Sequence, residues 1–366
     1  MKITFLLPGA PLHPVGGVRV VFEYANHLAA RGHDVSVVFP RYRNRVPGTV
    51  KAAFGNWVER LRTAVAPRSV AWHPLDRRVR MHYVPTLHPC YIPDGDIVVA
   101  TAWWTARYAQ VLPPAKGARF YLIQAFEVWD GSEEEVSATW RYPMRKIVVG
   151  RWLLEKALEM GIPAREVRHI TNAIDHTRFR LLQPIENRPA RVAMLYHPHT
   201  WKGAAEGIQA LEMARSAIPG LRAVLFGVER RPADLPSWFE YCRNPDQAEL
   251  VEYVYNRSST FLCSSWTEGW GLPGAEAMAC GCALVSTDNG GVRDYADHGE
   301  NALLVPPRDP PALAAQLIRV LRDEPLRLAI ARRGTERIRQ FTWERATDAL
   351  EDWFAEAAGR GASWPR

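Results

Sequence analysis

Short runs of hydrophobic residues alternate with amphipathic stretches in the first half of the chain. Residues 3–7 and 35–39 have the pattern of buried strands, and Val18, Val21, Phe22, Ala25 and Leu28 between them recur at helical spacing. A strand, a loop, a helix and a strand form a βαβ unit, which implies a parallel sheet. The same pattern predicts further strands at 97–101, 119–123 and 147–149, and helices at 104–112 and 151–160.

The pattern restarts after residues 180–190, which lack periodicity, contain two prolines and are therefore predicted to be a linker. Beyond them we expect strands at 192–196, 221–226, 260–263 and 283–286, helices at 203–217, 246–256 and 272–280, and a helical tail at 309–358 broken near Pro325 and 341–343. The chain is thus predicted to be an α/β protein with two doubly wound, Rossmann-like domains, at 1–180 and 187–342. In such folds ligands bind at the carboxyl ends of the strands, and two facing domains place a cleft between them.

Composition agrees with two globular domains. The chain has 366 residues, of which 47% are hydrophobic and 23% charged, and no apolar run approaches the ~20 residues that a membrane span needs. The apolar N-terminus is interpreted as a first strand and not as a signal peptide, because proline and glycine follow it at once. The five cysteines form no paired framework, which favours a reducing, cytoplasmic location.

Positive charge is concentrated between residues 41 and 80. This segment holds ten basic and two acidic side chains, a net charge of +8 in a chain of net charge +7. Trp57, Leu61 and Val65 lie at helical spacing within it. Two interpretations stay open: a peripheral contact with an anionic membrane surface, or the solvated, arginine-rich face of a core helix. Nucleic acid is not predicted as a partner, because no recognised binding module is present.

Several other local motifs give only weak evidence for a functional site. The loop after the first strand fits neither a dinucleotide fingerprint nor a P-loop, but Gly16 and Gly17 stand at a helix start, where they form either a flexible turn or an anion site. Asp94-Gly95-Asp96 is interpreted as a turn. His197 and His199 lack further ligands at a suitable spacing, so no metal site is predicted.

The strongest motif spans residues 264–281, where a strand ends, a glycine-rich loop follows and a helix begins near Leu272 and Pro273. Such a loop presents backbone N–H donors and the positive end of a helix to a phosphate. Glu276, one turn into the helix, suits the two hydroxyls of a ribose, and Glu268, before the helix, suits the hydroxyls of a sugar. Alternatively, both glutamates merely complement the helix dipole.

Glu268 and Glu276 form an E-x7-E element, and with its surroundings it resembles the retaining family-4 glycosyltransferases of the GT-B fold. The resemblance extends through residues 286–294, 297–307 and 341–344, and to 171–175 and the glycine pair Gly16-Gly17. It implies a C-terminal helix, about 343–358, that crosses back to the first domain. It also implies a nucleoside-diphosphate sugar as co-substrate, a glycan or lipid-linked acceptor, retention of anomeric configuration, and no metal or other cofactor.

The resemblance also implies roles for individual residues. Glu276 would hold the ribose, Glu268 would contact the donor sugar, and Lys202, one of only six lysines, would hold the diphosphate. The predicted donor-binding set is Gly16, Gly17, His197, Lys202, Glu268, Gly269, Trp270, Gly271, Leu272 and Glu276, with Glu268 and Lys202 as the catalytic pair. Contacts to the base are expected near 241–245.

Two departures from the family pattern matter. His197 stands where the family has an arginine, which suggests that leaving-group stabilisation depends on protonation of His197 and hence on pH. In the first domain, where relatives have a histidine near the sugar, this chain has Gln124, Glu127 and Trp129, which we expect on the acceptor side. This region and residues 19–26 resemble the rhamnosyltransferase-like branch. The alternatives are a GT-B-fold epimerase or phosphorylase, which the E-x7-E element disfavours, and a non-catalytic nucleotide-sugar-binding relative.

Overall fold

A computed structural model describes residues 1–41, 70 and 72–359. By contacts, this structure divides into two compact units. Of the described residues, the first unit contains those within 1–149, 153–170 and 343–359, and the second contains residues 150–152 and 171–342. Most of the basic segment, including Trp57, Leu61 and Val65, lies outside the described residues, so its contact with a membrane stays a prediction.

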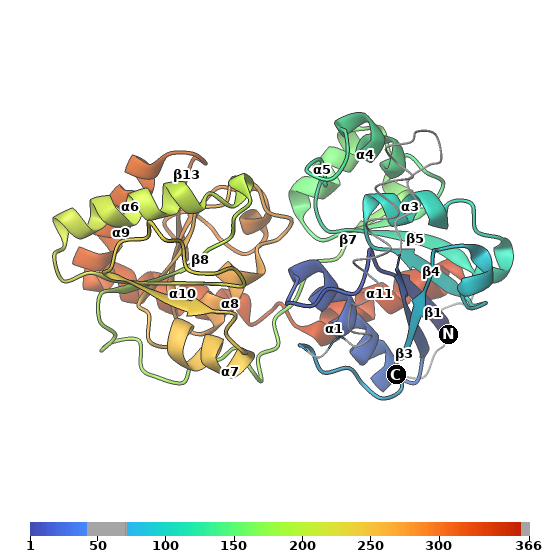
Figure 1. Cartoon of the computed structure of the whole chain (residues 1–366), viewed down its shortest axis with the longest axis horizontal. Coiled ribbons are helices and arrows are strands. Elements are labelled where there is room, and N and C mark those ends of the chain that lie inside the picture. The colour runs from blue at the N-terminus through green and yellow to red at the C-terminus, as the bar shows by residue number, and fades with distance from the viewer. Residues whose placement is uncertain (42–69, 71, 360–366) are drawn as a thin grey trace. The chain divides into compact units, whose positions relative to one another are not determined.

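The first unit is built on one parallel sheet with strand order β3-β2-β1-β4-β5-β6-β7 (Figure 1). Its strands are β1 (Lys2–Leu6), β2 (Asp34–Pro40), β3 (Arg80–Val84), β4 (Ile97–Ala100), β5 (Ala118–Ile123), β6 (Arg145–Val148) and β7 (Val167–His169). The helices that accompany it are α1 (Gly16–Ala30), α3 (Trp103–Ala109), α4 (Glu133–Trp140), α5 (Arg151–Glu159, which begins in the residues grouped with the second unit) and α11 (Trp343–Ala357).

The second unit repeats this plan with the order β10-β9-β8-β11-β12-β13. Its strands are β8 (Arg191–Leu195), β9 (Arg222–Gly227), β10 (Phe239–Arg243), β11 (Thr260–Cys263), β12 (Ala283–Thr287) and β13 (Ala302–Val305). Its helices are α6 (Ala204–Ala217), α7 (Gln247–Glu249), a π-helical segment (Leu250–Tyr255), α8 (Leu272–Ala279), α9 (Pro310–Arg322) and α10 (Glu324–Ile338). In both units the order reverses beside the first strand, as in Rossmann folds, so the prediction of two Rossmann-like domains is confirmed.

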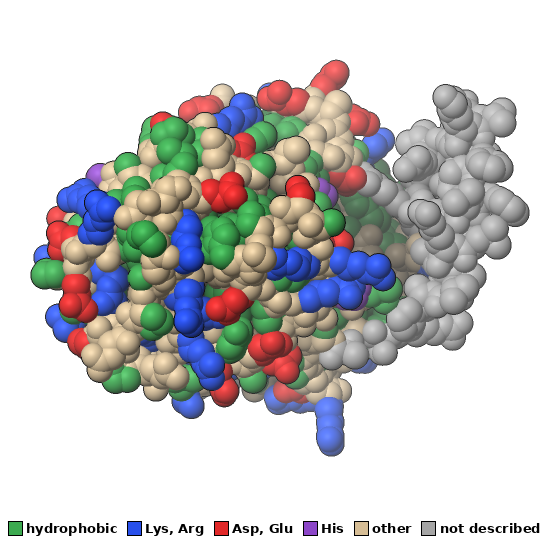
Figure 2. Space-filling view, turned by 60° about the vertical axis from the view of Figure 1, so that its left-hand side comes forward, with side chains coloured by type: hydrophobic (Ala, Val, Ile, Leu, Met, Phe, Trp, Pro, Cys, Tyr) green, Lys and Arg blue, Asp and Glu red, His purple; other side chains and the backbone are tan. Residues whose placement is uncertain are grey.

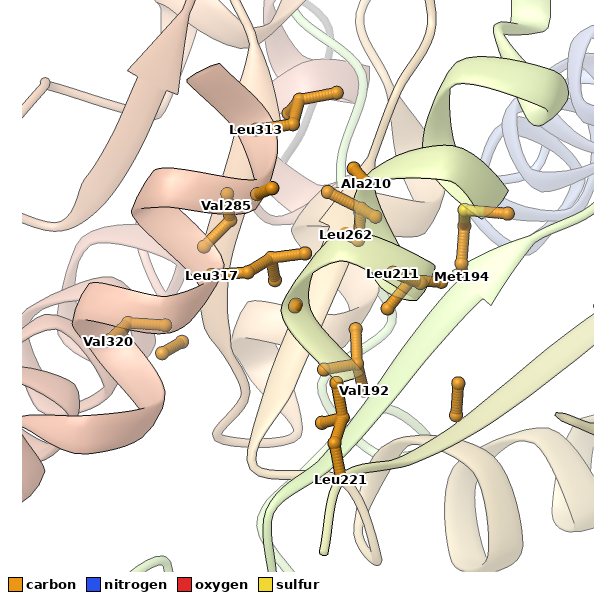
Figure 3. Close-up of a cluster of buried hydrophobic side chains, with 14 of the residues drawn as sticks. Val192, Met194, Ala210, Leu211, Leu221, Leu262, Val285, Leu313, Leu317 and Val320 are labelled. Carbon is orange, nitrogen blue, oxygen red and sulfur yellow. The ribbon is translucent and has the colours of Figure 1, made fainter. Parts of the chain in front are cut away.

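The core of the second unit explains why its strands form. The central strands are buried on both faces, so their sequences are continuous hydrophobic runs. On one face, side chains of α6 and α9 meet those of β8, β11 and β12, as Figure 3 shows for Leu211, Leu317 and Val285. Leu284, the neighbour of Val285, points to the opposite face, where it lies beside Gly274 of α8. Helices therefore cover both faces of the sheet.

The C-terminal helix α11 packs in the first unit, beside α1 (Figure 1). The rings of Trp343 and Tyr24 lie 5.2 Å apart, and those of Phe354 and Phe120 lie 4.7 Å apart. Glu351 forms ion pairs with Arg31 and with His33. The chain thus returns to its first unit after completing the second, as the resemblance implied.

Residues 180–190 contain no helix or strand, as expected, but they pack within the second unit and the division falls ten residues earlier. Arg188 anchors this segment, because its buried guanidinium donates to the carbonyls of Ser258 and Cys280. The expected helix at 246–256 also differs: it is one turn of α-helix followed by the π-helical segment.

The surface shows no dominant patch in the view of Figure 2, where basic, acidic and apolar side chains are interspersed. Among the described residues, no helix combines the length and the apolar character that crossing a membrane requires.

Candidate functional site

The candidate residues of the second unit follow two adjacent strands. β8 pairs in parallel with β11, and these strands flank the point where the strand order reverses. The loop after β8 leads to Lys202, and the loop after β11 leads to Glu268. Because the crossovers leave such a point in opposite directions, it opens a crevice at the carboxyl ends of the strands. The fold therefore brings together residues that are far apart in the sequence.

Lys202 and Glu268 form a two-contact ion pair. The Lys202 Nζ atom lies 2.7 Å from Glu268 Oε1 and 2.9 Å from Oε2, and the Ser265 hydroxyl donates to Oε1 at 2.7 Å. Side-chain exposures of 23% and 13% keep both groups partly accessible. An ammonium has three N–H donors, so after two contacts with Glu268 one remains for another oxygen.

Backbone contacts hold the two loops in place. The Trp266 amide donates to the Trp201 carbonyl at 2.7 Å, which ties the Glu268 loop to the Lys202 loop. Gly203 has a positive φ of 60°, and a Cβ there would overlap the Ser264 carbonyl. The indole of Trp152, which groups with the second unit, donates to the Glu268 carbonyl at 2.9 Å.

The N-terminus of α8 lies beside the Lys202–Glu268 ion pair. Gly271 adopts a left-handed conformation with a φ of 93°, its carbonyl accepts from the Tyr295 hydroxyl at 2.8 Å, and the first turn of α8 has no side-chain cap and no acidic residue. Its N–H groups and the helix dipole therefore favour an anion. A small pocket of about 20 Å³ lies between this turn and the ion pair, lined among others by Lys202, Glu268, Gly271 and Gly274.

Glu276 and Trp270 are more deeply buried than the pattern suggested. Glu276 is 2% exposed and accepts a hydrogen bond from the Tyr255 hydroxyl at 3.2 Å. Trp270 is also 2% exposed, and its ring packs 4.9 Å from Tyr295 and 5.5 Å from Phe341. Trp270, Gly269 and Leu272 do not line the small pocket, whereas Glu268, Gly271 and Pro273 do.

His197 is a neutral base in this structure. Partial burial, followed by the nearby His199 and Lys202, lowers its pKa from 6.5 to about 4. Its Nδ1 accepts from the backbone N–H of His199 at 3.2 Å, which leaves the proton on Nε2. A pKa of about 4 favours the neutral imidazole of His197 between pH 5.5 and 8. The hypothesis that leaving-group stabilisation depends on protonation of His197 stays a prediction.

In the first unit, the structure brings two of the predicted residues together. Gly16 and Gly17 open α1, two residues before the expected start, and Gln124 at the end of β5 donates through Nε2 to the Gly17 carbonyl at 3.0 Å. A Cβ on Gly17 would lie 3.1 Å from that nitrogen, so a larger residue would require the Gln124 side chain to shift by a few tenths of an ångström. Glu127 instead accepts from the backbone N–H of Trp103, the first residue of α3, at 2.6 Å.

Trp129 is 44% exposed on the loop that follows Glu127. The structure therefore separates the roles within this loop: Glu127 holds a helix start, while Trp129 presents an aromatic ring to the surroundings.

Within the described ranges, no three His, Cys, Asp or Glu side chains are grouped so that they could hold a metal ion. In the Asp94-Gly95-Asp96 turn, Asp94 pairs with Lys116 at 2.6 Å and Asp96 accepts from the Lys2 amide at 2.8 Å. These contacts agree with the interpretation as a turn.

Sequence reasoning missed the residues that support the site. Ser265 and Tyr295 hold the ion pair and the glycine loop, and Tyr255 holds Glu276. Only Ser265 gave a signal, because it lies in the same strand-end motif as Glu268; the other two are far away in the sequence.

The two Rossmann-like units together have the architecture of the GT-B fold. The model of the family described as "Glycosyl transferases group 1" matches residues 183–337, which contain Lys202, Glu268 and Glu276. This segment is therefore similar to the group 1 glycosyltransferases.

Two relatives match over a larger part of the chain. The O-antigen biosynthesis protein RfbC of Myxococcus xanthus is 27% identical over 92% of this chain and 26% of its own length. The phosphatidyl-myo-inositol mannosyltransferase of Mycolicibacterium smegmatis is 26% identical over 60% of each chain. The chain spans between 26% and 30% of the length of the first three curated relatives that it matches.

Solved structures show the same fold. HepE of Anabaena, in complex with UDP-glucose, has a TM-score of 0.72 at 16% identity and covers 97% of this chain and 100% of its own. Sucrose-phosphate synthase of Thermosynechococcus elongatus has a TM-score of 0.71 at 18% identity, over 97% and 98%. At these identities the likeness concerns the fold alone.

Proposed function

We propose that this chain is a retaining glycosyltransferase that moves a sugar from a nucleoside-diphosphate donor to a glycan or lipid-linked acceptor in polysaccharide biosynthesis. The observation that carries the proposal is the Lys202–Glu268 ion pair beside the uncapped N-terminus of α8, at the point where the strand order reverses. A relative named for O-antigen biosynthesis supports the class of product.

The site suits the leaving group of such a reaction. When the bond between the anomeric carbon and the diphosphate breaks, negative charge develops on the departing oxygen. Lys202 and the first N–H groups of α8 are the positive groups available there, and they act without a resident metal ion. His197, being neutral, offers an Nε2–H donor but no charge.

Glu268 contacts the donor sugar. It also orients Lys202, because both of its carboxylate oxygens accept hydrogen bonds from the Lys202 ammonium. Glu276 binds the ribose hydroxyls. The acceptor hydroxyl forms the new bond to the anomeric carbon on the side that the diphosphate leaves, and its proton passes to the departing phosphate oxygen. No glycosidase-like pair of carboxylates is assigned here.

The test is release of nucleoside diphosphate from a panel of UDP-, GDP-, ADP- and dTDP-sugars, with rhamnose-bearing and lipid-linked acceptors. Lys202→Ala should lower the rate with the active donor about 100-fold or more, as loss of a transition-state charge contact does. Lys116→Ala is the matched control, because Lys116 also pairs with a carboxylate, Asp94, but in the first unit. It should leave the rate unchanged.

The outcomes separate the alternatives. Turnover that does not fall with Lys202→Ala would refute the assigned site. Binding of one donor without turnover for any acceptor would favour a non-catalytic nucleotide-sugar-binding protein. A product whose anomeric configuration is inverted, seen by NMR, would overturn retention alone.

A further inference from the structure

The second unit has a larger pocket at the amino ends of its strands, opposite the carboxyl ends that carry Lys202 and Glu268. It has a volume of about 390 Å³ and forms where β8, β9 and β10 begin. Arg191 and Arg222 are the first residues of β8 and β9 and lie side by side in register. A five-residue strand spans roughly 16 Å, so β8 separates this pocket from the loop that carries Lys202. The pocket is therefore distinct from the proposed donor site.

The charged lining of this pocket is strongly positive. It consists of Arg188, Arg191, Arg222, Arg257 and one acid, Glu240. Glu240 is already engaged: its Oε2 accepts from Arg191 Nη2 at 2.7 Å and from the Tyr253 hydroxyl at 2.9 Å. The guanidinium groups of Arg222 and Arg257 line the pocket, and both side chains are exposed. Arg222 lies near enough to help lower the pKa of Glu240, but the hydrogen bonds that Glu240 accepts come from Arg191 and Tyr253.

Tyr253 and Arg188 show that the pocket is built rather than incidental. The Tyr253 ring lies between two guanidinium groups, 4.8 Å from that of Arg191 and 5.0 Å from that of Arg257. Tyr253 belongs to the π-helical segment, a rare conformation that is frequent at functional sites. Arg188 is 7% exposed, and its Nε has no hydrogen-bond partner in the described part of the chain.

We propose that this pocket binds a phosphate-bearing small molecule, such as a sugar phosphate or a diphosphate. Guanidinium groups match the geometry of phosphate oxygens with two parallel hydrogen bonds. Four arginines against one glutamate leave a net charge of +3, which suits a group with two or more negative charges. A volume of about 390 Å³ lies within the range of small-molecule sites. The proposal does not depend on the transferase activity.

The experiment is titration calorimetry with pyrophosphate and with glucose 6-phosphate on the full chain. The Arg222→Gln/Arg257→Gln double variant should bind at least tenfold more weakly than the wild type. The matched control, Arg141→Gln/Arg165→Gln, removes the same charge from exposed positions in the first unit and should bind as the wild type does. Each comparison is repeated in proteins that also carry Lys202→Ala, which removes the positive charge of the proposed donor site. The tenfold difference in affinity between the double variant and its control should persist there.

Several results would overturn the proposal: equal affinity in the double variant and its control, binding lost with Lys202→Ala alone, or no binding of either soluble phosphate together with no vesicle binding that depends on Arg222 and Arg257. A lipid headgroup offers the same phosphate chemistry, so vesicles with and without phosphatidic acid form a second arm. Vesicle binding that depends on Arg222 and Arg257, without binding of soluble phosphates, would assign the pocket to a membrane lipid and support phosphate recognition. Melting temperatures within about 2 °C of the wild type confirm that the exposed substitutions leave the fold intact.

Discussion

The two units share one architecture but present different chemistry at the carboxyl ends of their strands. In the second unit these ends carry a charged pair, Lys202–Glu268, beside an uncapped helix N-terminus. In the first unit the loop after β5 carries Gln124, which donates to Gly17, and the exposed Trp129, while the carboxylate of that loop, Glu127, is held by the backbone N–H of Trp103. One doubly wound plan can thus serve two kinds of ligand, because the loops, and not the sheet, decide the chemistry.

This difference suggests a division of labour. The charged strand ends of the second unit suit the nucleoside diphosphate. The exposed ring of Trp129 in the first unit suits the flat face of a sugar or a lipid portion of the acceptor. The following experiments test this difference between the two units by changing one unit at a time.

The largest effect is expected from Glu276→Gln in the second unit. Gln is close to isosteric and can still accept from Tyr255, so the fold should persist. Hydrogen bonds to a charged group are worth about 1.5–3 kcal/mol, so the KM for the donor should rise about 10- to 150-fold. The measurement is the donor KM with ribose and with 2′-deoxyribose nucleotides.

The deoxy donor makes this test specific. The wild type should lose affinity when the 2′-hydroxyl is removed, and Glu276→Gln should be nearly insensitive to its removal. If both proteins lose the same factor, Glu276 does not bind that hydroxyl and serves only to hold Tyr255.

A smaller effect is expected from Trp129→Ala in the first unit. Loss of an aromatic contact should raise the acceptor KM about tenfold, since burying such a ring contributes a few kcal/mol at most. Donor hydrolysis without acceptor should not change. Tyr91→Ala is the control: Tyr91 is similarly exposed, at 43% against 44%, but precedes β4 and so lies toward the other edge of the sheet. A change in donor hydrolysis would place Trp129 on the donor side.

The same contrast shows what a sequence can predict. The central strands were predictable because burial on both faces requires continuous hydrophobic runs. β3, β7, β10 and β13 were missed, and all four are edge strands of their sheets. In β3 and β10 polar residues interrupt the hydrophobic run, as in Phe239-Glu240-Tyr241, whereas β13 is a short apolar run of four residues. The E-x7-E motif was visible because its residues are local in the chain.

Other features depend on folding and do not follow from periodicity or local motifs; the pairing of Lys202 with Glu268 was expected from the resemblance alone. Lys202 and Glu268 are 66 residues apart, and only the pairing of β8 with β11 places them within 2.7 Å. The burial of Trp270 and the neutrality of His197 follow from neighbours that periodicity does not reveal. Arg188 looked like part of a polar linker, but five hydrogen bonds from its two terminal nitrogens pin that segment to the second unit.

His197 offers a subtler test within the charged unit. Its folded-state pKa of about 4 lies below the unfolded value of about 6.5, so between these pH values the unfolded chain binds more protons. The free energy of unfolding should therefore fall as the pH drops from 6.5 towards 4. His197→Gln should lose less stability than the wild type between pH 7 and pH 5, as measured by urea unfolding.

The activity profile completes this test. Between pH 5.5 and 8 the donor kcat/KM of the wild type should show no inflection that His197→Gln removes. An inflection near pH 6 that disappears in the variant would mean that the bound diphosphate raises the pKa of His197 and restores its positive charge. Protonated His197 would then take the place of the arginine found in the similar glycosyltransferases.

The smallest effect is expected from removal of metal ions. If Lys202 and the N–H groups of α8 neutralise the leaving diphosphate, treatment with EDTA followed by desalting should change the rate by less than about twofold. The informative comparison is with Lys202→Ala, in which added Mg²⁺ could replace the missing charge. Rescue of Lys202→Ala by Mg²⁺, with a wild type indifferent to it, would identify charge on the diphosphate as the function of Lys202. A wild type that stops with EDTA and recovers with Mg²⁺ would show that the charged edge of the second unit is not sufficient by itself.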